Sequence, residues 1–300
     1  MKKRNYPLWT ELPYAGEKQP PRKAVEPDAG KWRTYFIQHD GYGGFKTLQG
    51  RPIKLDITDP NRIDWYQQLK QVQQSLASLT EKKITIARYW SAGPPTKQWT
   101  PIADRLIDTY SVEAPRAARI LAALHAGIND AMVATWAVKF QYLVPRPNQL
   151  DPHLATVVCT PKHPSYVSGH SSVSGAAEVI LGYFFPGEKN RLRQLAEEDA
   201  VSRLYAGVHY PADNQEGLKL GRQIGRIVIS ELKKDKTYLG QTDIPYRENR
   251  RAQLLPPPYE QAIPFDFDTS CDSLLLDLSP GKSNRNNYAP KPRLYNSRKS

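Results

Sequence analysis

Cysteine is scarce in this chain of 300 residues, which contains two, Cys159 and Cys271. They form neither a CxxC pair nor a cluster with histidine, so the sequence lacks the ligand spacing of a zinc site. Two cysteines are also too few to staple a small secreted domain, and a chain of this length can bury a core without disulfides. We therefore expect both cysteines to be reduced thiols.

Long apolar runs are missing as well. No segment reaches 18 uninterrupted apolar residues, and the most apolar one, residues 176–185, is interrupted by Glu178. A membrane-spanning helix is therefore not expected. The first residues include a basic cluster with no apolar stretch behind it, which argues against a standard secretory signal and predicts a cytoplasmic protein.

Acidic residues are outnumbered by basic ones, 30 to 42, which gives a formal net charge of +12. Half of this excess lies in the last twenty residues, which contain no acid but hold Lys282, Arg285, Lys291, Arg293, Arg298 and Lys299. Because charged ends with few aromatics are usually solvated, we predict a disordered tail. A non-catalytic anion-binding or nucleic-acid-binding protein is an alternative, but Tyr288 and Tyr295 do not form a known nucleic-acid module.

Strand patterns are nearly absent, and helical periodicity dominates the middle of the chain. Asp59 and Pro60 can begin a helix whose apolar residues recur at spacings of three and four up to Leu79. Helix start and stop signals predict further helices over residues 115–140, 171–185, 189–205 and 211–232.

Proline and glycine are concentrated outside this helical region. The sequence predicts an irregular N-terminal arm over residues 1–57, a helical core over 58–235, and a proline-rich segment with the basic tail over 236–300. The expected fold class is all-α, a helical bundle with irregular N- and C-terminal arms.

Unusual polar residues gather at the ends of these helices. They are Lys139 at the end of the second helix, Arg146 seven positions later, Ser168, Gly169 and His170 at the start of the third, Arg203 at the end of the fourth, and His209 and Asp213 at the start of the fifth. Each residue alone is weak evidence, because most lysines and arginines are surface charges. Their shared position at helix ends, in this order, is the signal.

These residue types suit the binding of a tetrahedral oxyanion. Arginine offers a planar fork of donors, lysine a compact charge, and a Ser-Gly pair at a helix start offers backbone amides. Asp213 can hydrogen-bond one imidazole nitrogen of His209, which leaves the other lone pair free to attack phosphorus or to ligate a metal centre. His170 can then donate or accept the proton.

The three motifs resemble those of the superfamily of type 2 phosphatidic acid phosphatases and vanadium-dependent haloperoxidases. The likeness extends over residues 81–228, and residues 86–103 and 125–131 are similar to the soluble bacterial haloperoxidase-like branch. One departure is Val167, where the family usually has proline before Ser168.

The resemblance implies a role for each motif residue. The oxyanion cradle would consist of Lys139, Arg146, Ser168, Gly169 and Arg203. His209 would be the phosphate nucleophile or the ligand of vanadium, Asp213 would orient it, and His170 would be the acid-base residue. The family includes enzymes that act on small molecules, and a homo-oligomer is compatible with the sequence.

Phosphate and vanadate are nearly isosteric, so the cradle by itself does not separate the two chemistries. Trp136 and His163 occupy positions where haloperoxidases have residues associated with halide handling, although a core aromatic and an ordinary loop histidine are equally good readings. We therefore expect a haloperoxidase with vanadate as cofactor and hydrogen peroxide and halide as substrates. The alternative is a soluble acid-phosphatase-like phosphomonoesterase with a phosphohistidine intermediate and no cofactor.

Overall fold

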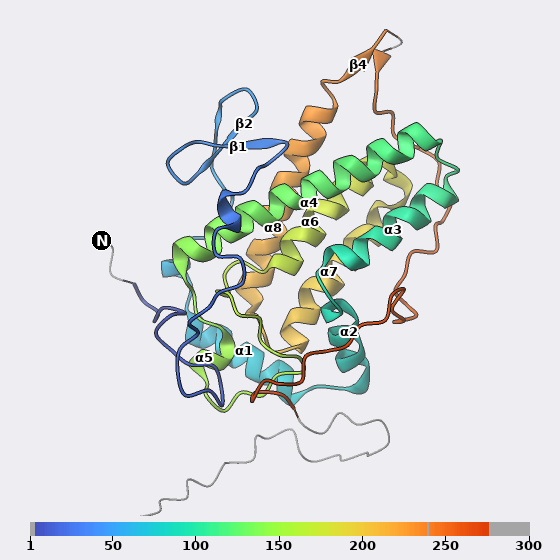
Figure 1. Ribbon diagram of the computed structural model, residues 1–300. Coiled ribbons are helices and arrows are strands. Elements are labelled where there is room, and N and C mark those ends of the chain that lie inside the picture. The colour runs from blue at the N-terminus through green and yellow to red at the C-terminus, as the bar shows by residue number, and fades with distance from the viewer. Residues whose placement is uncertain (1–3, 239, 276–300) are drawn as a thin grey trace, which may run out of the picture.

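The helices of the chain lie side by side in an elongated bundle, and long N-terminal and C-terminal segments run along its outside (Figure 1). The computed structural model describes residues 4–238 and 240–275, so the basic tail that the sequence predicts to be disordered lies outside the described residues. The predicted all-α class is confirmed. Within the described chain, no helix combines the length and apolar character that crossing a bilayer requires.

The bundle consists of α1 (Trp65–Ala77), α2 (Glu81–Ser91), α3 (Thr96–Thr109), α4 (Ala114–Tyr142), α5 (Pro147–Leu150), α6 (Gly169–Phe184), α7 (Lys189–Tyr205) and α8 (Pro211–Leu232). Short 3-10 helices cover Ala29–Lys31, Pro60–Arg62 and Pro186–Glu188. The helices predicted around α1, α4, α6, α7 and α8 are confirmed, whereas α2, α3 and α5 were not predicted from the sequence.

The first predicted helix begins later than expected. Asp59 caps the 3-10 helix at Pro60–Arg62 through a bond from Asn61 N–H, and Asp64 caps α1. Asp59 and Asp64 are both suitable N-cap residues for the first α-helix. The α-helix begins after Asp64, because its regularly spaced apolar residues, from Trp65 onward, are buried.

The N-terminal arm predicted to be irregular contains a small antiparallel sheet. Its strands β1 (Ile37–His39), β2 (Phe45–Thr47) and β3 (Pro52–Ile53) pair in that order. A second pair, β4 (Lys236–Thr237) with β5 (Gly240–Gln241), projects beyond α8 (Figure 1). Strands this short leave almost no alternating pattern in a sequence. The proposed boundaries at residues 57 and 235 stay a prediction.

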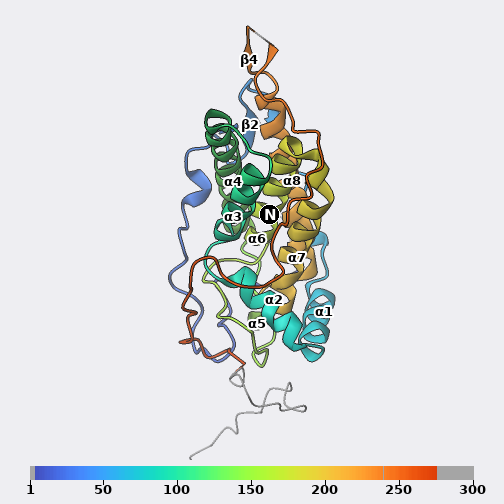
Figure 2. The same ribbon diagram turned by 90° about the vertical axis from the view of Figure 1, so that its right-hand side faces the viewer.

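Helix α6 lies in the middle of the bundle, with α3 and α4 on one side and α7 and α8 on the other (Figure 2). Glycines let the backbones of α6 and α8 approach closely. A Cβ atom on Gly217 would lie 2.6 Å from the carbonyl oxygen of Ser168, and one on Gly175 would lie 2.7 Å from that of Leu218. The first turns of α6 and α8, which carry two of the predicted motifs, are therefore held in a fixed relation.

A buried carboxylate on α4 helps to attach the arm. Asp130 accepts hydrogen bonds from the backbone N–H groups of Tyr35, Phe36 and Ile37, with shortest distances of 2.9, 2.7 and 3.2 Å. These bonds satisfy three amides at the start of β1, so the arm follows α4 as a defined segment.

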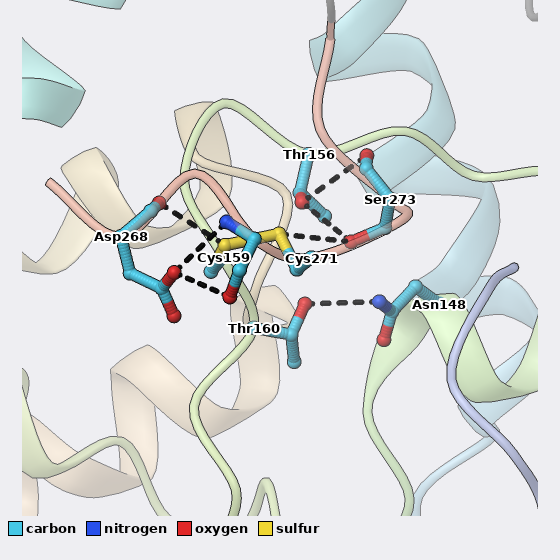
Figure 3. Close-up of a disulfide and its surroundings, with 8 residues drawn as sticks. Asn148, Thr156, Cys159, Thr160, Asp268, Cys271 and Ser273 are labelled. Atoms are coloured by element: carbon cyan, nitrogen blue, oxygen red, sulfur yellow. Dashed lines mark hydrogen bonds between the residues drawn. A yellow bond between two sulfur atoms is a disulfide. The ribbon is translucent and has the colours of Figure 1, made fainter. Parts of the chain in front are cut away.

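The two cysteines form a disulfide, so the expectation of reduced thiols was wrong (Figure 3). The bond joins Cys159, in the loop before α6, to Cys271 in the C-terminal segment, and Thr156 N–H donates to Ser273 O at 2.7 Å beside it. A separation of 112 residues gives no local signal of pairing. Because disulfides persist mainly in oxidising compartments, this bond argues against the cytoplasmic location, which stays a prediction.

Candidate active site

Four helix ends meet at one end of the bundle. Helices α4 and α7 end there, and α6 and α8 begin there, because each connection reverses the direction of the chain (Figure 1). The residues brought to this end are those that the sequence singled out: Trp136, Lys139, Arg146, His163, Ser168, Gly169, His170, Arg203, His209 and Asp213. Their functional roles stay a prediction, but their contacts can be described.

Asp213 holds His209 in one orientation. Pro211 begins α8, which places Asp213 in its first turn, and Oδ2 of Asp213 lies 2.8 Å from Nδ1 of His209. The same oxygen accepts bonds from Tyr210 N–H at 3.1 Å and from the Ser165 hydroxyl. Since a carboxylate accepts, Nδ1 carries the proton and the Nε2 lone pair points away from Asp213. Burial raises the pKa of Asp213 to about 6.

Arg146 lies between two imidazoles. Its Nη1 is 2.9 Å from Nε2 of His209 and donates to Val208 O at 2.6 Å, whereas its Nη2 is 3.0 Å from Nδ1 of His163. Its Nε donates to His163 O at 2.9 Å. The guanidinium, which is fully buried, therefore faces the one lone pair of His209 that Asp213 leaves free.

The other two cations of the predicted cradle also bond to neutral groups. Lys139 Nζ donates to the carbonyl oxygens of Pro164 and Ser165, both at 2.8 Å. Arg203 donates through Nη2 to Ala87 O at 3.0 Å and to the Ser91 hydroxyl at 2.8 Å. Burial lowers the pKa of Lys139 well below its usual value and lowers that of Arg203 to about 10.

The charges of these three side chains indicate what the site can bind. None of the hydrogen bonds made by the Lys139, Arg146 and Arg203 side chains within the described chain goes to a carboxylate. Buried charges without a direct counter-ion are costly unless a ligand supplies one. The donor set therefore fits a multiply charged oxyanion such as vanadate or phosphate.

The start of α6 adds backbone donors to this cradle. Ser168 is the N-cap, its hydroxyl accepts from Ser171 N–H at 3.4 Å, and its own N–H donates to Asp213 O at 3.0 Å. The first-turn amides that follow, beginning at Gly169, have no acceptor within the helix, as at every helix start. Val167, the departure from the family pattern, is buried in the core and leaves this cap in place.

Two further histidines border the cradle. His170 Nε2 lies 3.0 Å from Trp90 O, and the His163 ring lies 4.8 Å from the Trp136 ring. The pKa values of His163, His170 and His209 are lowered well below the usual value, first by burial and then by the neighbouring arginines and Lys139. All three are therefore neutral at pH 7.

The sequence did not assign a role to several residues that support the site. Ser165 donates to Asp213, and Ser202 accepts from Arg203 Nε at 2.9 Å while its hydroxyl donates to Asp199 O. Burial raises the pKa of Asp199 to about 7. Asp199 lies four residues before Arg203 on the same helix face, and this spacing could have predicted its role beside Arg203. No sequence pattern could have predicted the role of Ser165.

Comparison with a family model places these motifs in a known superfamily. Residues 119–235 match the PAP2 superfamily, and this range contains every residue of the predicted site. The superfamily indicated by the sequence motifs is thereby confirmed.

The chain also resembles individual enzymes of two kinds. It is 33% identical over 114 residues to a "Vanadium-dependent bromoperoxidase" of Corallina pilulifera, and the matched region covers 29% of this chain and 19% of that protein. It is 34% identical over 107 residues to a "Decaprenylphosphoryl-5-phosphoribose phosphatase" of Mycobacterium tuberculosis, which covers 36% of this chain and 59% of that protein. The chain thus spans about a fifth of the bromoperoxidase and 59% of the phosphatase.

Among solved structures, the fold is similar to that of the first bacterial vanadium-dependent iodoperoxidase. The two share 25% sequence identity with a TM-score of 0.59, over 76% of this chain and 62% of the other. Relatives in this superfamily are enzymes, both haloperoxidases and phosphatases.

Proposed function

We propose that this protein is a vanadium-dependent haloperoxidase, which uses hydrogen peroxide to oxidise a halide ion. The observation that carries the oxyanion site is that the buried side chains of Lys139, Arg146 and Arg203 make no hydrogen bond to a carboxylate of the described residues. The His163–Trp136 pair at the edge of this set, 4.8 Å apart, favours the haloperoxidase over the phosphatase. The similarity to the iodoperoxidase over 76% of the chain supports the same choice.

In this proposal, vanadate is held by Lys139, Arg146, Arg203 and the start of α6, with His209 Nε2 as the protein ligand of vanadium. When bound, vanadate supplies a Lewis acid that activates peroxide towards the halide. The role of Asp213 is to keep the proton on Nδ1 of His209, so that the lone pair of Nε2 is available to bind vanadium. Arg146 Nη1 must move off this nitrogen when the ligand binds, because the two atoms are 2.9 Å apart.

The two bordering histidines, His163 and His170, can donate or accept protons. If His170 donates through Nε2 to Trp90 O, then Nδ1 carries a lone pair and can accept a proton from a substrate in the cradle. His163 is neutral, and its Nδ1 lies 3.0 Å from Arg146 Nη2. The His163 ring can therefore form a hydrogen bond to a water molecule or to a proton-accepting group beside the anion. The Trp136 ring packs against the His163 ring, with their centres 4.8 Å apart.

A phosphomonoesterase is the second candidate, and the mycobacterial phosphatase at 34% identity favours it. In that reaction, the Nε2 lone pair of His209 forms a bond to phosphorus, the ester P–O bond breaks, and the leaving alkoxide takes a proton. His170 would have to supply this proton, yet burial keeps its pKa low and the ring neutral. The negative charge of a bound phosphate would raise the pKa of His170, so His170 could supply the proton once the phosphoester is bound.

The deciding experiment assays the purified chain for both activities, with and without orthovanadate. We expect peroxide-dependent bromination or iodination that requires vanadate and is lost in His209→Ala. Rapid phosphomonoester hydrolysis that vanadate inhibits, without halide oxidation, would replace the proposal by the phosphatase.

A further inference from the structure

Helices α7 and α8 lie beside α6 on one side of the bundle (Figure 2). A second concave site is lined by residues of these three helices. It is a groove of about 770 Å³, and its wall is completed by Pro245 and Arg247 from the segment after α8. Glu178 in the groove is eight residues beyond His170 on α6, or about 12 Å along the helix. Arg226 is fifteen residues beyond Pro211, the first residue of α8, or about 22 Å along that helix. The groove is therefore separate from the candidate active site.

Cations dominate the lining of this groove. They are Lys189, Arg193, Arg222, Arg226, Lys233 and Arg247, against a single carboxylate, Glu178. Glu178 already accepts two bonds from Arg222, at 2.9 and 2.7 Å. The pocket thus has an excess of positive charge that no lining residue neutralises.

Three of these cations are available to a ligand. Arg193 pairs with Glu197 at 2.8 Å, and Lys233 lies 5.4 Å from the centre of the Tyr183 ring. Lys189, Arg226 and Arg247 make no ion pair with any residue in the described ranges. They come from α7, α8 and the segment after it, so they face the groove from different elements.

The groove also has an apolar part with a fixed shape. Val179, Tyr183 and Ile229 contribute to its lining. The segment that carries Arg247 is attached to the end of α6, because Tyr246 N–H donates to Phe184 O at 2.7 Å and the Tyr183 hydroxyl donates to Asp243 O at 2.9 Å. A ligand here can therefore place charge on the rim and an apolar group against the helices.

We propose that this groove binds a small organic phosphate with at least two negative charges and an attached ring. Lys189, Arg226 and Arg247, which make no ion pair within the described part of the chain, recognise the phosphate groups, since guanidinium forks match phosphate oxygens. The apolar lining takes the ring, and the volume is in the range of small-molecule sites. This inference does not depend on the reaction proposed for the active site.

Titration calorimetry with adenosine diphosphate tests the proposal. We expect binding to wild type that is weakened at least tenfold in the double variant Arg226→Glu/Arg247→Glu. The matched control is Lys70→Glu/Lys82→Glu, which makes the same change in net charge at two exposed lysines on α1 and α2 and should bind like wild type. Equal weakening in both double variants would reduce the effect to overall charge and overturn the proposal.

Further probes separate the parts of the ligand and the two sites. Adenosine alone should bind at least tenfold more weakly than adenosine diphosphate, and so should pyrophosphate; equal binding of either would overturn the stated ligand class. Binding should persist in Arg203→Ala, because the candidate active site is elsewhere. Loss of binding in this variant, or binding confined to phosphatidic acid vesicles, would overturn the proposal.

Discussion

Nδ1 of His209 lies 2.8 Å from Oδ2 of Asp213, one helical turn apart at the start of α8. This pair orients the Nε2 lone pair towards the buried guanidinium of Arg146. Any reaction at this site, with vanadium or with phosphorus, depends on that lone pair being available.

Asp213→Asn should lower turnover by about 10²–10⁴-fold while the protein stays folded, because an amide NH₂ facing Nδ1 favours the wrong tautomer of His209. Steady-state kinetics of halide oxidation and of phosphoester hydrolysis measure the effect. Asp104→Asn, at an exposed position on α3, is the control and should change neither activity. A fully active Asp213→Asn enzyme would show that the pair is structural.

Orthovanadate should stabilise the folded protein, because the cradle exists in the native state alone. A ligand at one hundred times its dissociation constant adds about 2.7 kcal/mol to the free energy of unfolding. Arg203→Ala should lose this gain, and Arg105→Ala, an exposed arginine on α3, should keep it. Thermal melts of the three proteins with and without orthovanadate decide, and identical shifts in all of them would mean that the oxyanion site is misplaced.

His163→Ala should separate the two proposed reactions. Its ring stands beside Arg146 and Trp136, where it can serve halide oxidation, but it is not the proposed nucleophile. We expect the variant to lose bromide oxidation much more than phosphoester hydrolysis, whereas His209→Ala loses both. His153→Ala, at an exposed position, controls for the loss of a histidine. Unchanged halide oxidation in His163→Ala would remove the main argument for the haloperoxidase.

The lowered pKa of His163 predicts a loss of stability in acid. Its pKa is well below 6.5 in the folded state, so the unfolded chain binds more protons as the pH falls below 6.5, and the free energy of unfolding decreases. For one such group the loss between pH 7.5 and 5.5 is about 1 kcal/mol. Asp199 and Asp213, with pKa values raised to about 7 and about 6, act in the opposite direction.

Because several groups contribute, the measurement compares two proteins. Urea unfolding at both pH values should show a loss that is smaller by about 1 kcal/mol in His163→Gln than in wild type. The same loss in both proteins would mean that His163 titrates normally in the folded state.

Removing the disulfide should destabilise the protein without removing any residue of the cradle. The bond closes a loop with a sequence separation of 112 residues, for which the chain-entropy model gives about 5 kcal/mol. Urea unfolding of Cys159→Ser/Cys271→Ser should reveal this loss, and dithiothreitol should bring wild type to the same value. A reductant effect in the double variant would point to a cause other than this bond.

The local part of the site follows from the sequence. Proline at the start of α8 places Asp213 one turn after His209, and Ser168 caps α6, because capping and i, i+4 contacts depend on neighbours along the chain. The same local rules predict the long helices and therefore the helix ends at which the motifs lie. They do not predict α2 and α3, because Pro94, Pro95 and Pro101 interrupt the helical pattern there. Nor do they predict the small sheet of the arm, whose strands of two or three residues carry almost no periodic signal.

Tertiary structure decided the contacts that join distant segments. Ser165 meets Asp213 across 48 residues, Arg146 reaches His209 across 63, and Cys159 bonds to Cys271 across 112. Such pairs have no fixed spacing, because they depend on how closely α6 and α8 pack and on where the two arms run. The sequence by itself determined which side chains stand at the helix ends; the packing of glycine-lined helices determined that their charges meet in one buried place.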